Sequence, residues 1–415
     1  MVGTKKNLLL LCYYYPPIKS IASIRSRNVA VESRQHFAQV HIFTTSNRRL
    51  LPTDEYDPAP DVPVVEIPTL DPRTLFPKPA LKNQSTTGNR LYTWLNSFPL
   101  NALIGLGGAV YTLCAFFYGC YYVRKYRITH LFSSYAPYSD HYTAWLLTLI
   151  FPKLQWIADF RDLHIDPVRP EVHGVRLQKW INRRLLARAK LVTTVSDGLA
   201  KHLQPYNDRV VVVRNAIPSQ RIRVVPKFEK GAQFVISYTG NIYPDRQDPE
   251  FLFRTVARLQ DNTILLQYAG KDGKIWTELA RKYGLEEQTV DLGIVPHKTA
   301  LQLQYRSEVN LLLSWSNPES YGILTGKFYE YIAARQPILL VIRGSYDPDF
   351  EQLFHRYHLG AIFYTTENID SLAFWIQSLT LAWKSNSLPK ITEKTVDAFS
   401  WSAQWNRLIS CLFED

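Results

Sequence analysis

The chain has 415 residues, too many for one ordinary core and suited to two domains of roughly 100 to 200 residues each. It is 46% hydrophobic and 20% charged, which excludes a disordered or collagen-like protein. Lysine and arginine (48) outnumber aspartate and glutamate (36), and the net charge of +12 favours anionic partners such as phosphorylated substrates, acidic lipid surfaces or nucleic acid.

The N-terminal sequence MVGTKKNLLLLCYYYPP has a basic start and then a short apolar run without a small-residue cleavage pattern. We interpret this run as the first strand and not as a signal peptide. The four cysteines, Cys12, Cys114, Cys120 and Cys411, form no C-x2-C pair. This spacing disfavours a zinc site or a disulfide framework and predicts a protein of the reducing cytoplasm.

The loop after this strand reads YYYPPIKSIASIR and is expected to lead into a helix. Arg25 falls in the first turn of that helix, where it is predicted to point towards a ligand, with the phosphate of an acceptor as the candidate. The alternative is a salt bridge within the N-terminal domain.

Residues 102–123 form an uncharged apolar stretch, ALIGLGGAVYTLCAFFYGCYYV, which reaches the length of a membrane span. The segments on either side read as strands of one sheet, which a single span would separate. We therefore expect a buried helix or an element at a membrane surface, although a span stays an alternative. The basic residues that follow, Arg124, Lys125 and Arg127, suit anionic headgroups and solvent equally well.

Polar residues follow the next two predicted strands. His141 lies in SSYAPYSDHYTAW, at a turn from strand to helix, where a single histidine is usually structural. The strand QWIADF ends on Asp159, Arg161 and Asp162 of DFRD. These charges predict either an internal ion pair of Arg161 or a site at which a carboxylate orients or deprotonates a nucleophile.

The following helix, RLQKWINRRLLARAK, carries Arg176, Lys179 and Arg183 at a spacing that places them on one face beside Trp180. Such a face fits an anionic membrane, and it fits a solvated helix equally well.

Short β-rich runs alternate with helical patterns along the whole chain, which predicts an α/β fold with two doubly wound, mostly parallel sheets. The basic, proline-containing segment around residue 220 marks the boundary. We predict an N-terminal domain over 1–220 and a C-terminal domain over 221–395. A terminal helix over 396–415 is free to pack on either domain.

In the second half, ESYGILTGKFYEYIAARQPIL lies between the predicted strands VNLLLSW and PILLVI. Gly322 and Gly326 allow a ligand close to the backbone, Lys327 suits a diphosphate at the start of a helix, and Glu330 can accept hydrogen bonds from two ribose hydroxyls. The alternative is a surface pair of Lys327 and Glu330.

Two common nucleotide-binding motifs are absent from the sequence. Phe328 follows Lys327 where a Walker A loop requires serine or threonine, and only three residues separate Gly322 from Gly326. The run GLGGAV has Val110 at the third glycine of the dinucleotide fingerprint. The sequence therefore disfavours both an ATPase and an NAD-dependent enzyme.

Several motifs in a consistent order resemble glycosyltransferase family 4, retaining enzymes of the GT-B fold. They are YYYPP, WIADFRD, VVVVRNAI, YTGNIY, YAGKDG, LGIVPH and KFYEYIAARQPIL, and they cover nearly the whole chain. WIADFRD resembles the subgroup that carries a D-x-R-D motif in the N-terminal domain. The resemblance implies two Rossmann-like domains that face each other across a cleft, with the nucleotide sugar on the C-terminal domain.

The resemblance also implies roles for individual residues, in an enzyme that needs no metal or other cofactor. Lys327 would share the diphosphate with Arg246, and Glu330 would hold the ribose. The first glutamate of the family's E-x7-E pattern would fall on Gly322, so Glu319 is either a replacement that reaches the sugar or a cap of the turn. The remaining donor candidates are Gly240, Asn241 and Gly326, the catalytic candidates Asp159, Arg161 and Asp162, and the acceptor-side candidates Arg25 and His141.

The sequence therefore predicts a cytoplasmic, membrane-associated hexosyltransferase of polysaccharide synthesis. Its partners would be a nucleotide sugar, a glycan or lipid-linked acceptor and an anionic membrane surface. The alternatives are a GT-B nucleotide-sugar epimerase and a non-catalytic basic protein that binds polysaccharide or nucleic acid. Nucleic acid ranks low because no zinc finger, RNA-recognition signature or long basic tail is present.

Overall fold

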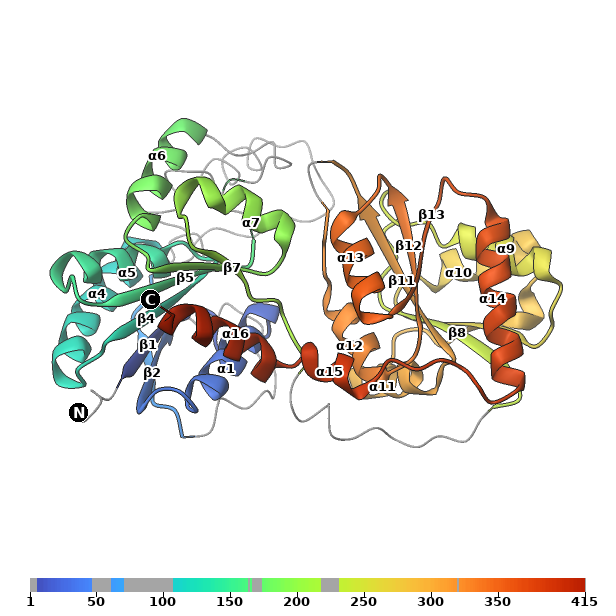
Figure 1. Cartoon of the computed structure of the whole chain (residues 1–415), viewed down its shortest axis with the longest axis horizontal. Helices are drawn as coiled ribbons and strands as arrows, with labels where there is room; N and C mark the ends of the chain where they lie inside the picture. The colour runs from blue at the N-terminus through green and yellow to red at the C-terminus, as the bar shows by residue number, and fades with distance from the viewer. Residues whose placement is uncertain are drawn as a thin grey trace. The chain divides into compact units, whose positions relative to one another are not determined.

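The computed structural model describes residues 6–46, 61–70, 107–162, 165, 174–217, 231–318 and 321–414. The chain forms two compact units (Figure 1). Unit 1 comprises Met1–Arg214 and Gln404–Asp415, and unit 2 comprises Asn215–Ala403. Each unit is an α/β structure built on one parallel sheet.

Within its described residues, unit 1 contains seven parallel strands in the order β3-β2-β1-β4-β5-β6-β7. The order reverses between β1 and β4, which are neighbours in the sheet although two strands separate them in sequence. All five residues of β1 are buried, as expected for a strand covered on both faces. The strands are β1 Asn7–Leu11, β2 Gln39–Thr45, β3 Val64–Ile67, β4 His130–Tyr135, β5 Gln155–Phe160, β6 Leu191–Thr194 and β7 Val210–Val212.

Helices cover both faces of this sheet. One face packs against side chains of α4, α5 and α6, and the other carries Phe132, whose ring lies 5.8 Å from that of Trp405 in α16. The described helices of unit 1 are α1 Ile21–Ser33, α4 Gly108–Lys125, α5 Ser139–Ile150, α6 Val175–Leu186, α7 Asp197–Leu203, the short 3₁₀ turn η3 Gln204–Tyr206 and α16 Trp401–Phe413, which begins in unit 2.

The apolar stretch over 102–123 forms most of α4, while residues 102–106 lie outside the described part. Tyr111, Ala115 and Val123 are buried against the sheet. Gly119 sits so close to α5 that a β-carbon there would lie 2.8 Å from Leu147, which explains why a glycine occurs in the middle of this helix. Among the described residues, no helix combines the length and apolarity that crossing a membrane requires.

Unit 2 contains six parallel strands within its described residues, in the order β10-β9-β8-β11-β12-β13. The order reverses between β8 and β11. The strands are β8 Phe234–Thr239, β9 Ile264–Ala269, β10 Thr289–Asp291, β11 Val309–Ser316, β12 Ile338–Gly344 and β13 Gly360–Tyr364. The helices are α9 Glu250–Leu259, α10 Gly273–Tyr283, η4 Glu286–Gln288, α11 His297–Arg306, α12 Gly326–Ala334, α13 Pro348–Tyr357, α14 Ile369–Lys384 and α15 Glu393–Ala398.

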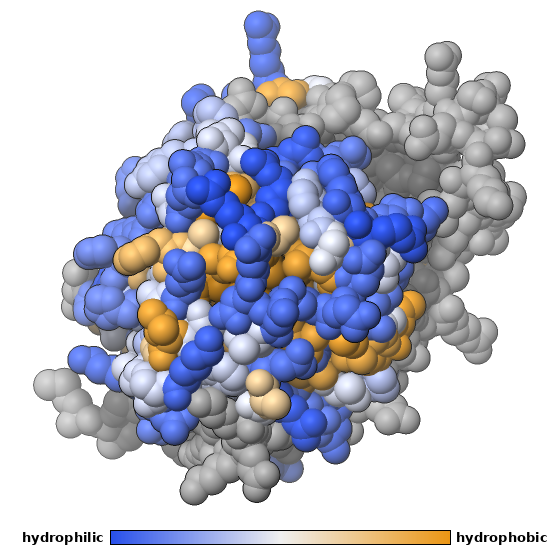
Figure 2. Space-filling model, turned by 90° about the vertical axis from the view of Figure 1, so that its right-hand side faces the viewer, coloured by the Kyte–Doolittle hydropathy of each residue, from blue (hydrophilic) through white to orange (hydrophobic). Residues whose placement is uncertain are grey.

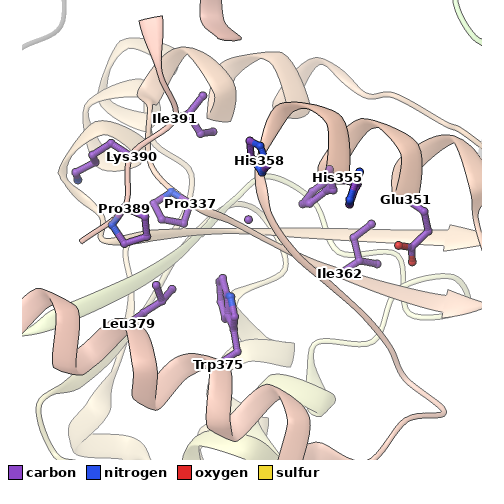
Figure 3. Close-up of a pocket in the computed structure, with 12 residues that line it drawn as sticks. Pro337, Glu351, His355, His358, Ile362, Trp375, Leu379, Pro389, Lys390 and Ile391 are labelled. Carbon is purple, nitrogen blue, oxygen red and sulfur yellow. The ribbon is translucent and has the colours of Figure 1, made fainter. Parts of the chain in front are cut away.

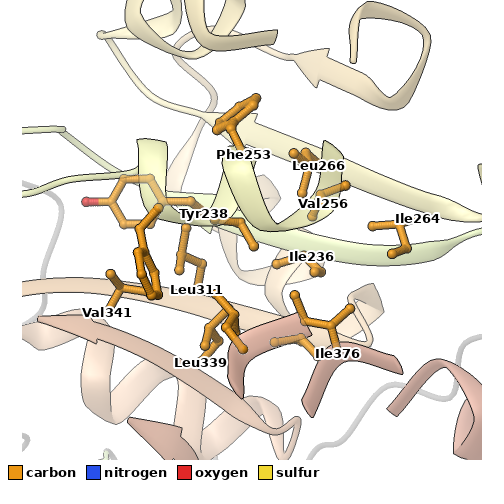
Figure 4. Packing of buried hydrophobic residues seen from close by; sticks show 14 of the residues in the cluster. Ile236, Tyr238, Phe253, Val256, Ile264, Leu266, Leu311, Leu339, Val341 and Ile376 are labelled. Carbon is orange, nitrogen blue, oxygen red and sulfur yellow. The ribbon is translucent and has the colours of Figure 1, made fainter. Parts of the chain in front are cut away.

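Alternating residues of the unit 2 strands enter two separate cores. Leu339 and Val341 of β12 belong to a cluster with α9, α10 and α14 (Figure 4), whereas Leu340 and Ile342 belong to a cluster with α12 and α13. This alternation follows from the two-residue period of a strand. Because both faces are covered, β12 reads as the continuous apolar run PILLVI.

The C-terminal helix α16 packs on unit 1. The Phe413 ring lies 6.2 Å from that of Phe37, and Arg209 donates a hydrogen bond of 2.7 Å to the carbonyl oxygen of Cys411. The chain leaves unit 1 after Arg214 and re-enters it at Gln404, and Arg214 N–H donates to the Gln404 side chain at 3.0 Å.

Candidate functional site

The strand order of unit 2 indicates where a ligand binds. In open parallel sheets, ligands bind beyond the carboxyl ends of the strands, at the point where the strand order reverses. In unit 2 this point lies between β8 and β11. The sequence candidates Gly240 and Asn241 follow β8 directly, and α12 with Lys327 and Glu330 follows β11.

Gly240 and Lys327 lie against each other at this edge. Gly240 has a φ of +129°, and a β-carbon there would lie 2.2 Å from Cε and 2.3 Å from Nζ of Lys327. The lysine side chain therefore occupies space that any other residue at position 240 would fill. Lys327 Nζ donates a hydrogen bond of 2.8 Å to the hydroxyl of Tyr238 and lies 4.4 Å from the centre of that ring.

Burial lowers the pKa of Lys327 to about 8, and the carboxylates of Glu330 and Asp272 only partly oppose the shift. An ammonium group held in such a place favours a bound anion, which would restore the electrostatic stabilisation lost on leaving water. Lys327 also lies in the first turn of α12, where the backbone N–H groups and the helix dipole add to the attraction for an anion.

Glu330 lies one turn after Lys327 and is held at both oxygens. Its Oε2 accepts a hydrogen bond of 3.0 Å from Nε2 of Gln304, which also donates to Oγ1 of Thr239 at 2.9 Å. Its Oε1 lies 2.9 Å from Nε2 of His297. Gln304 is buried, whereas the His297 side chain is 60% exposed, so a ligand can replace the histidine at Glu330 at low cost.

Gln304, Tyr238 and Asp272 are components of this site that the sequence did not single out. Tyr238 and Asp272 hold the backbone after β8: Tyr238 Oη donates to the carbonyl of Asn241 at 2.6 Å, and Asp272 accepts from Ile242 N–H at 2.8 Å. Gln304 falls within the helical pattern LQLQYR, and a glutamine in such a pattern does not by itself suggest a functional role. Only its burial beside Thr239 and Glu330 reveals its role.

The other predicted donor residues are placed as follows. Gly322 has a φ of +67° and donates its N–H to Asp347 at 2.8 Å, which fixes the loop before α12. Gly326 borders open space, so nothing within the chain requires a glycine there. Arg246 is exposed, with its guanidinium 4.8 Å from the ring centre of Trp315 in β11. Glu319 lies outside the described residues.

In unit 1, Arg25 and Asp159 form a buried pair. The Arg25 guanidinium donates to both carboxylate oxygens of Asp159, at 3.0 and 2.6 Å, and to the carbonyl of Val213 at 3.0 Å. Their side chains are 2% and 0% exposed. The structure thus shows the salt bridge that the sequence left as the alternative for Arg25, and it keeps the Asp159 carboxylate away from the surface.

Asp159 accepts two further hydrogen bonds, from the hydroxyls of Ser134 (3.1 Å) and Thr193 (2.8 Å). Burial acts to raise its pKa, but the Arg25 guanidinium, the Thr193 hydroxyl and the charge of Arg161 outweigh it, so the pKa of Asp159 lies below its usual range. The carboxylate is therefore ionised at neutral pH and its hydrogen bonds join β4, β5, β6 and α1.

Arg161 and Asp162 follow β5 and differ in exposure. Arg161 donates to the carbonyl of Ala136 at 2.9 Å and to Ser134 Oγ at 3.3 Å, and burial lowers its pKa. Asp162 is exposed. Of the two carboxylates among the predicted catalytic residues, that of Asp162 is exposed to solvent and that of Asp159 is buried.

His141 is fully buried in α5, with Nδ1 2.7 Å from Ser133 Oγ and its ring 4.6 Å from that of Phe160. Its neighbour Asp140, which the sequence did not single out, accepts from the N–H of Tyr13 and the hydroxyl of Tyr111 at 2.8 and 2.7 Å. Burial raises the pKa of Asp140 to about 7. The Asp140 carboxyl group thus holds the loop after β1, which contains Tyr13, against α4 and α5.

A pocket of about 450 Å³ in unit 2 lies away from the predicted residues. Its lining includes Pro337 and Gly360, which lie at the amino ends of β12 and β13, together with His355, Trp375 and Lys390 (Figure 3). The carboxyl ends that carry Gly240 and Lys327 are at the opposite edge of the sheet. Among the described residues, no group of three or more histidine, cysteine, aspartate or glutamate side chains is arranged to hold a metal ion.

No protein-family model and no curated protein sequence matches the chain. Among the solved structures similar to it, three match over nearly their full lengths with TM-scores of 0.57 to 0.64. A glycosyltransferase from Rickettsia africae ESF-5 has a TM-score of 0.64 at 13% identity, covering 99% of this chain and 98% of its own. A sucrose-phosphate synthase from Thermosynechococcus elongatus has a TM-score of 0.59 at 15% identity, covering 99% of both chains.

The third is the apo form of WaaB, a lipopolysaccharide outer core galactosyltransferase, with a TM-score of 0.57 at 12% identity, covering 98% of this chain and 99% of its own. At such low identities these likenesses establish the fold. The predicted α/β architecture of two Rossmann-like units of GT-B type is confirmed. Membership of glycosyltransferase family 4 stays a prediction from the motifs.

Proposed function

We propose that this protein is a retaining glycosyltransferase that moves a sugar from a nucleotide diphosphate sugar to a hydroxyl group of a glycan or lipid-linked glycan. The main support is the pairing of Lys327 with Gly240 at the point of strand reversal in unit 2, one helical turn before Glu330. The similarity to structures named as a glycosyltransferase and a galactosyltransferase supports the same class of reaction.

The chemistry of this transfer explains the residue types. A departing nucleoside diphosphate gains negative charge, and a preorganised cation at that place stabilises the transition state. Lys327 would take this role directly, and Arg246 would join it from the loop after β8. Because two side-chain cations would neutralise the diphosphate, the proposed mechanism requires no metal ion.

On the acceptor side, we assign the roles in unit 1 to Arg161 and Asp162. The exposed carboxylate of Asp162 at the end of β5 could orient or deprotonate an acceptor hydroxyl. Asp159 and Arg25 would not contact the acceptor, because their side chains are buried against each other. Their role would be to fix the position of the end of β5.

We also propose a cytoplasmic location. All four cysteines are free thiols, and Cys12 is buried. A reducing compartment is compatible with this arrangement.

The proposal is tested first by a thermal-shift screen of uridine, guanosine and adenosine diphosphate sugars, because a ligand of the native state stabilises it. The donor found in this way is then incubated with and without glycan acceptors, and the products are analysed. We expect sugar transfer only with an acceptor and with retained anomeric configuration. Isomerised donor without acceptor would instead identify an epimerase, and salt-sensitive binding of polyanions without any response to nucleotide sugars would identify a binding protein.

A second experiment separates the roles of Glu330 and Lys327. The variant Glu330→Gln should bind the nucleoside diphosphate about 10 to 100 times more weakly, since it loses charge-assisted hydrogen bonds to the ribose. Its affinity for inorganic pyrophosphate, which has no ribose, should stay unchanged when measured well below pH 8, where Lys327 is protonated with or without the Glu330 carboxylate. Calorimetric titration with both ligands measures the difference.

Glu308→Gln is a matched control in the same unit, because Glu308 accepts a hydrogen bond of 2.8 Å from the N–H of Val235 at the amino ends of β8 and β11, the opposite edge of the sheet. It should bind both ligands as the unaltered protein does. An equal loss of pyrophosphate and nucleoside diphosphate affinity in Glu330→Gln would show that Glu330 acts on the phosphates and not on the ribose.

A further inference from the structure

Helix α4 of unit 1 has an exposed apolar face. Successive residues of a helix are rotated by about 100°, which places the exposed side chains within an arc of about 140°. The buried residues Ala115, Gly119 and Val123 lie on the opposite side of the helix. The exposed apolar residues, which we call the α4 face, are Val110 (39%), Leu113 (53%), Phe117 (66%), Tyr118 (45%) and Tyr121 (53%).

The orientation of this face is fixed by contacts on the buried side. The hydroxyl of Tyr111 donates to Asp140 at 2.7 Å, and Gly119 allows α4 to lie directly against Leu147 of α5. Helices α4 and α5 are neighbours in Figure 1. Turning the α4 face inward would break this packing, so its aromatic side chains remain directed outward.

Within residues 107–158, the exposed charged side chains near the α4 face are all cationic. Arg124, Lys125 and Arg127 are exposed at its carboxyl end, and Lys153 is exposed after α5. Between residues 107 and 158 the sequence contains a single acidic residue, Asp140, and that side chain is fully buried. The surface of this segment therefore offers apolar and cationic groups without any carboxylate.

The cations are placed beside the aromatic rings. Lys125 Nζ lies 5.1 Å from the ring centre of Tyr121, and the Arg124 guanidinium lies 5.0 Å from that of Phe151, after α5. Phe117, Cys120 and Tyr121 line a hollow of about 570 Å³ together with Arg124 and Lys125. Rings with adjacent cations suit the interface of a bilayer, where the ring enters the acyl region and the cation meets a phosphate.

The face of the molecule seen in Figure 2 carries apolar areas that are bordered and interrupted by hydrophilic side chains. The exposed apolar side chains of the α4 face follow one helix and end at the basic residues Arg124 and Lys125. An apolar surface that ends at exposed cations is complementary to an anionic lipid surface.

We propose that the α4 face binds the surface of an anionic phospholipid bilayer, with Phe117 and Tyr121 inserted among the lipids and Arg124 and Lys125 at the headgroup phosphates. The proposal goes beyond the glycosyltransferase function, because it requires neither the donor nor the acceptor. In an enzyme with a lipid-linked acceptor, it would hold unit 1 at the membrane that contains the acceptor.

The test is co-sedimentation of the full chain with vesicles of phosphatidylcholine, with and without phosphatidylglycerol, in the absence of substrates. We expect binding to the anionic vesicles only. The double variant Phe117→Ser/Tyr121→Ser should lower the partition coefficient at least about tenfold, because each ring loses its burial in lipid. The variants Arg124→Gln and Lys125→Gln should each lower it about fivefold.

Phe374→Ser provides a matched control, since Phe374 is an exposed aromatic residue (75%) on α14 of unit 2, and it should bind vesicles normally. Failure of the unaltered chain to sediment, or normal binding by the serine double variant, would overturn the proposal. So would a dimer in light scattering that the serine variant converts to monomer, because the α4 face would then be a subunit interface. Nucleotide-sugar binding, measured without vesicles, distinguishes failure here from failure of the proposed function.

Discussion

The variant Lys327→Met is expected to lose most of its nucleotide binding and transfer activity while remaining folded. Removing the ammonium group should weaken binding of the nucleoside diphosphate about 10 to 100 times, the value of a charge-assisted hydrogen bond. The specificity constant for transfer, kcat/KM, should fall further, about 100 to 1,000 times, since the charge on the leaving group develops in the transition state. Calorimetric titration and initial rates measure the two effects.

Stability should not fall in this variant. Burial lowers the pKa of Lys327 to about 8, below the value near 10.5 expected for the unfolded chain. Below pH 8 the folded protein carries the full cost of a buried cation, and that cost decreases progressively as the pH rises from about 8, where the folded form releases the proton, to 10.5, where the unfolded chain does. Methionine removes the cost at every pH, so thermal unfolding at neutral pH should occur at an unchanged or higher temperature.

The same pKa predicts the pH dependence of binding. If only the protonated lysine binds a nucleotide diphosphate sugar, whose diphosphate does not itself titrate in this range, affinity is constant below pH 8 and falls by up to about tenfold per pH unit above it. Lys327→Met should show weak binding without this decline. Lys390→Met, which removes another lysine of unit 2 whose pKa is lowered by burial, should retain both the affinity and its pH profile. A pH profile in Lys327→Met like that of the unaltered protein would assign the titration to another group.

Much of the fold could be predicted from sequence because parallel strands covered on both faces are continuous apolar runs. This holds best for β1 and β12, which contain the uninterrupted runs LLLL and ILLVI, whereas β4, β5, β8, β9 and β11 are short β-rich runs with polar residues among the apolar ones. Strand β3, Val64–Ile67, was missed. It is a four-residue edge strand between Pro63 and Pro68, and proline normally argues against a strand.

The sequence predicts which residue types form the candidate site, but not which of them are in contact or buried. The types and order of Gly240, Lys327 and Glu330 are visible in the sequence, but the close contact between Gly240 and Lys327 joins segments 87 residues apart (327 minus 240) and depends on the strand order. Gln304 gave no signal, since a polar residue of a helix is usually exposed. Burial likewise distinguishes Asp159 from Asp162, although both belong to the same DFRD motif.

The structure shows how the apolar side chains of residues 108–123 are arranged. Apolar content alone is compatible with a buried helix, a surface helix and a span. The described part of this segment is a helix with one buried and one exposed apolar side, and small residues such as Ala115 and Gly119 lie on the buried side. The exposed side is the basis for the proposed lipid contact.

The variant Arg25→Met is expected to destabilise unit 1 by about 3 to 5 kcal/mol, because it leaves the Asp159 carboxylate buried without its cation. Thermal unfolding and hydrogen exchange of the β5 amides measure the loss. Arg34→Met is the matched control: it breaks an ion pair with Asp61 in which the two side chains are 43% and 82% exposed, and should cost less than about 1 kcal/mol.

The pH dependence of Arg25→Met identifies Asp159 as the origin of the loss. In the unaltered protein the pKa of Asp159 is below its unfolded value, so its contribution to stability is present at neutral pH and is lost as the pH falls. In Arg25→Met, burial without the guanidinium should raise this pKa above the unfolded value, so that acid protonates Asp159 and removes the penalty. The difference in unfolding free energy between the two proteins should therefore shrink on acidification. Normal stability combined with loss of transfer to the acceptor would instead show that Arg25 contacts the substrate, the role first predicted from its place after β1.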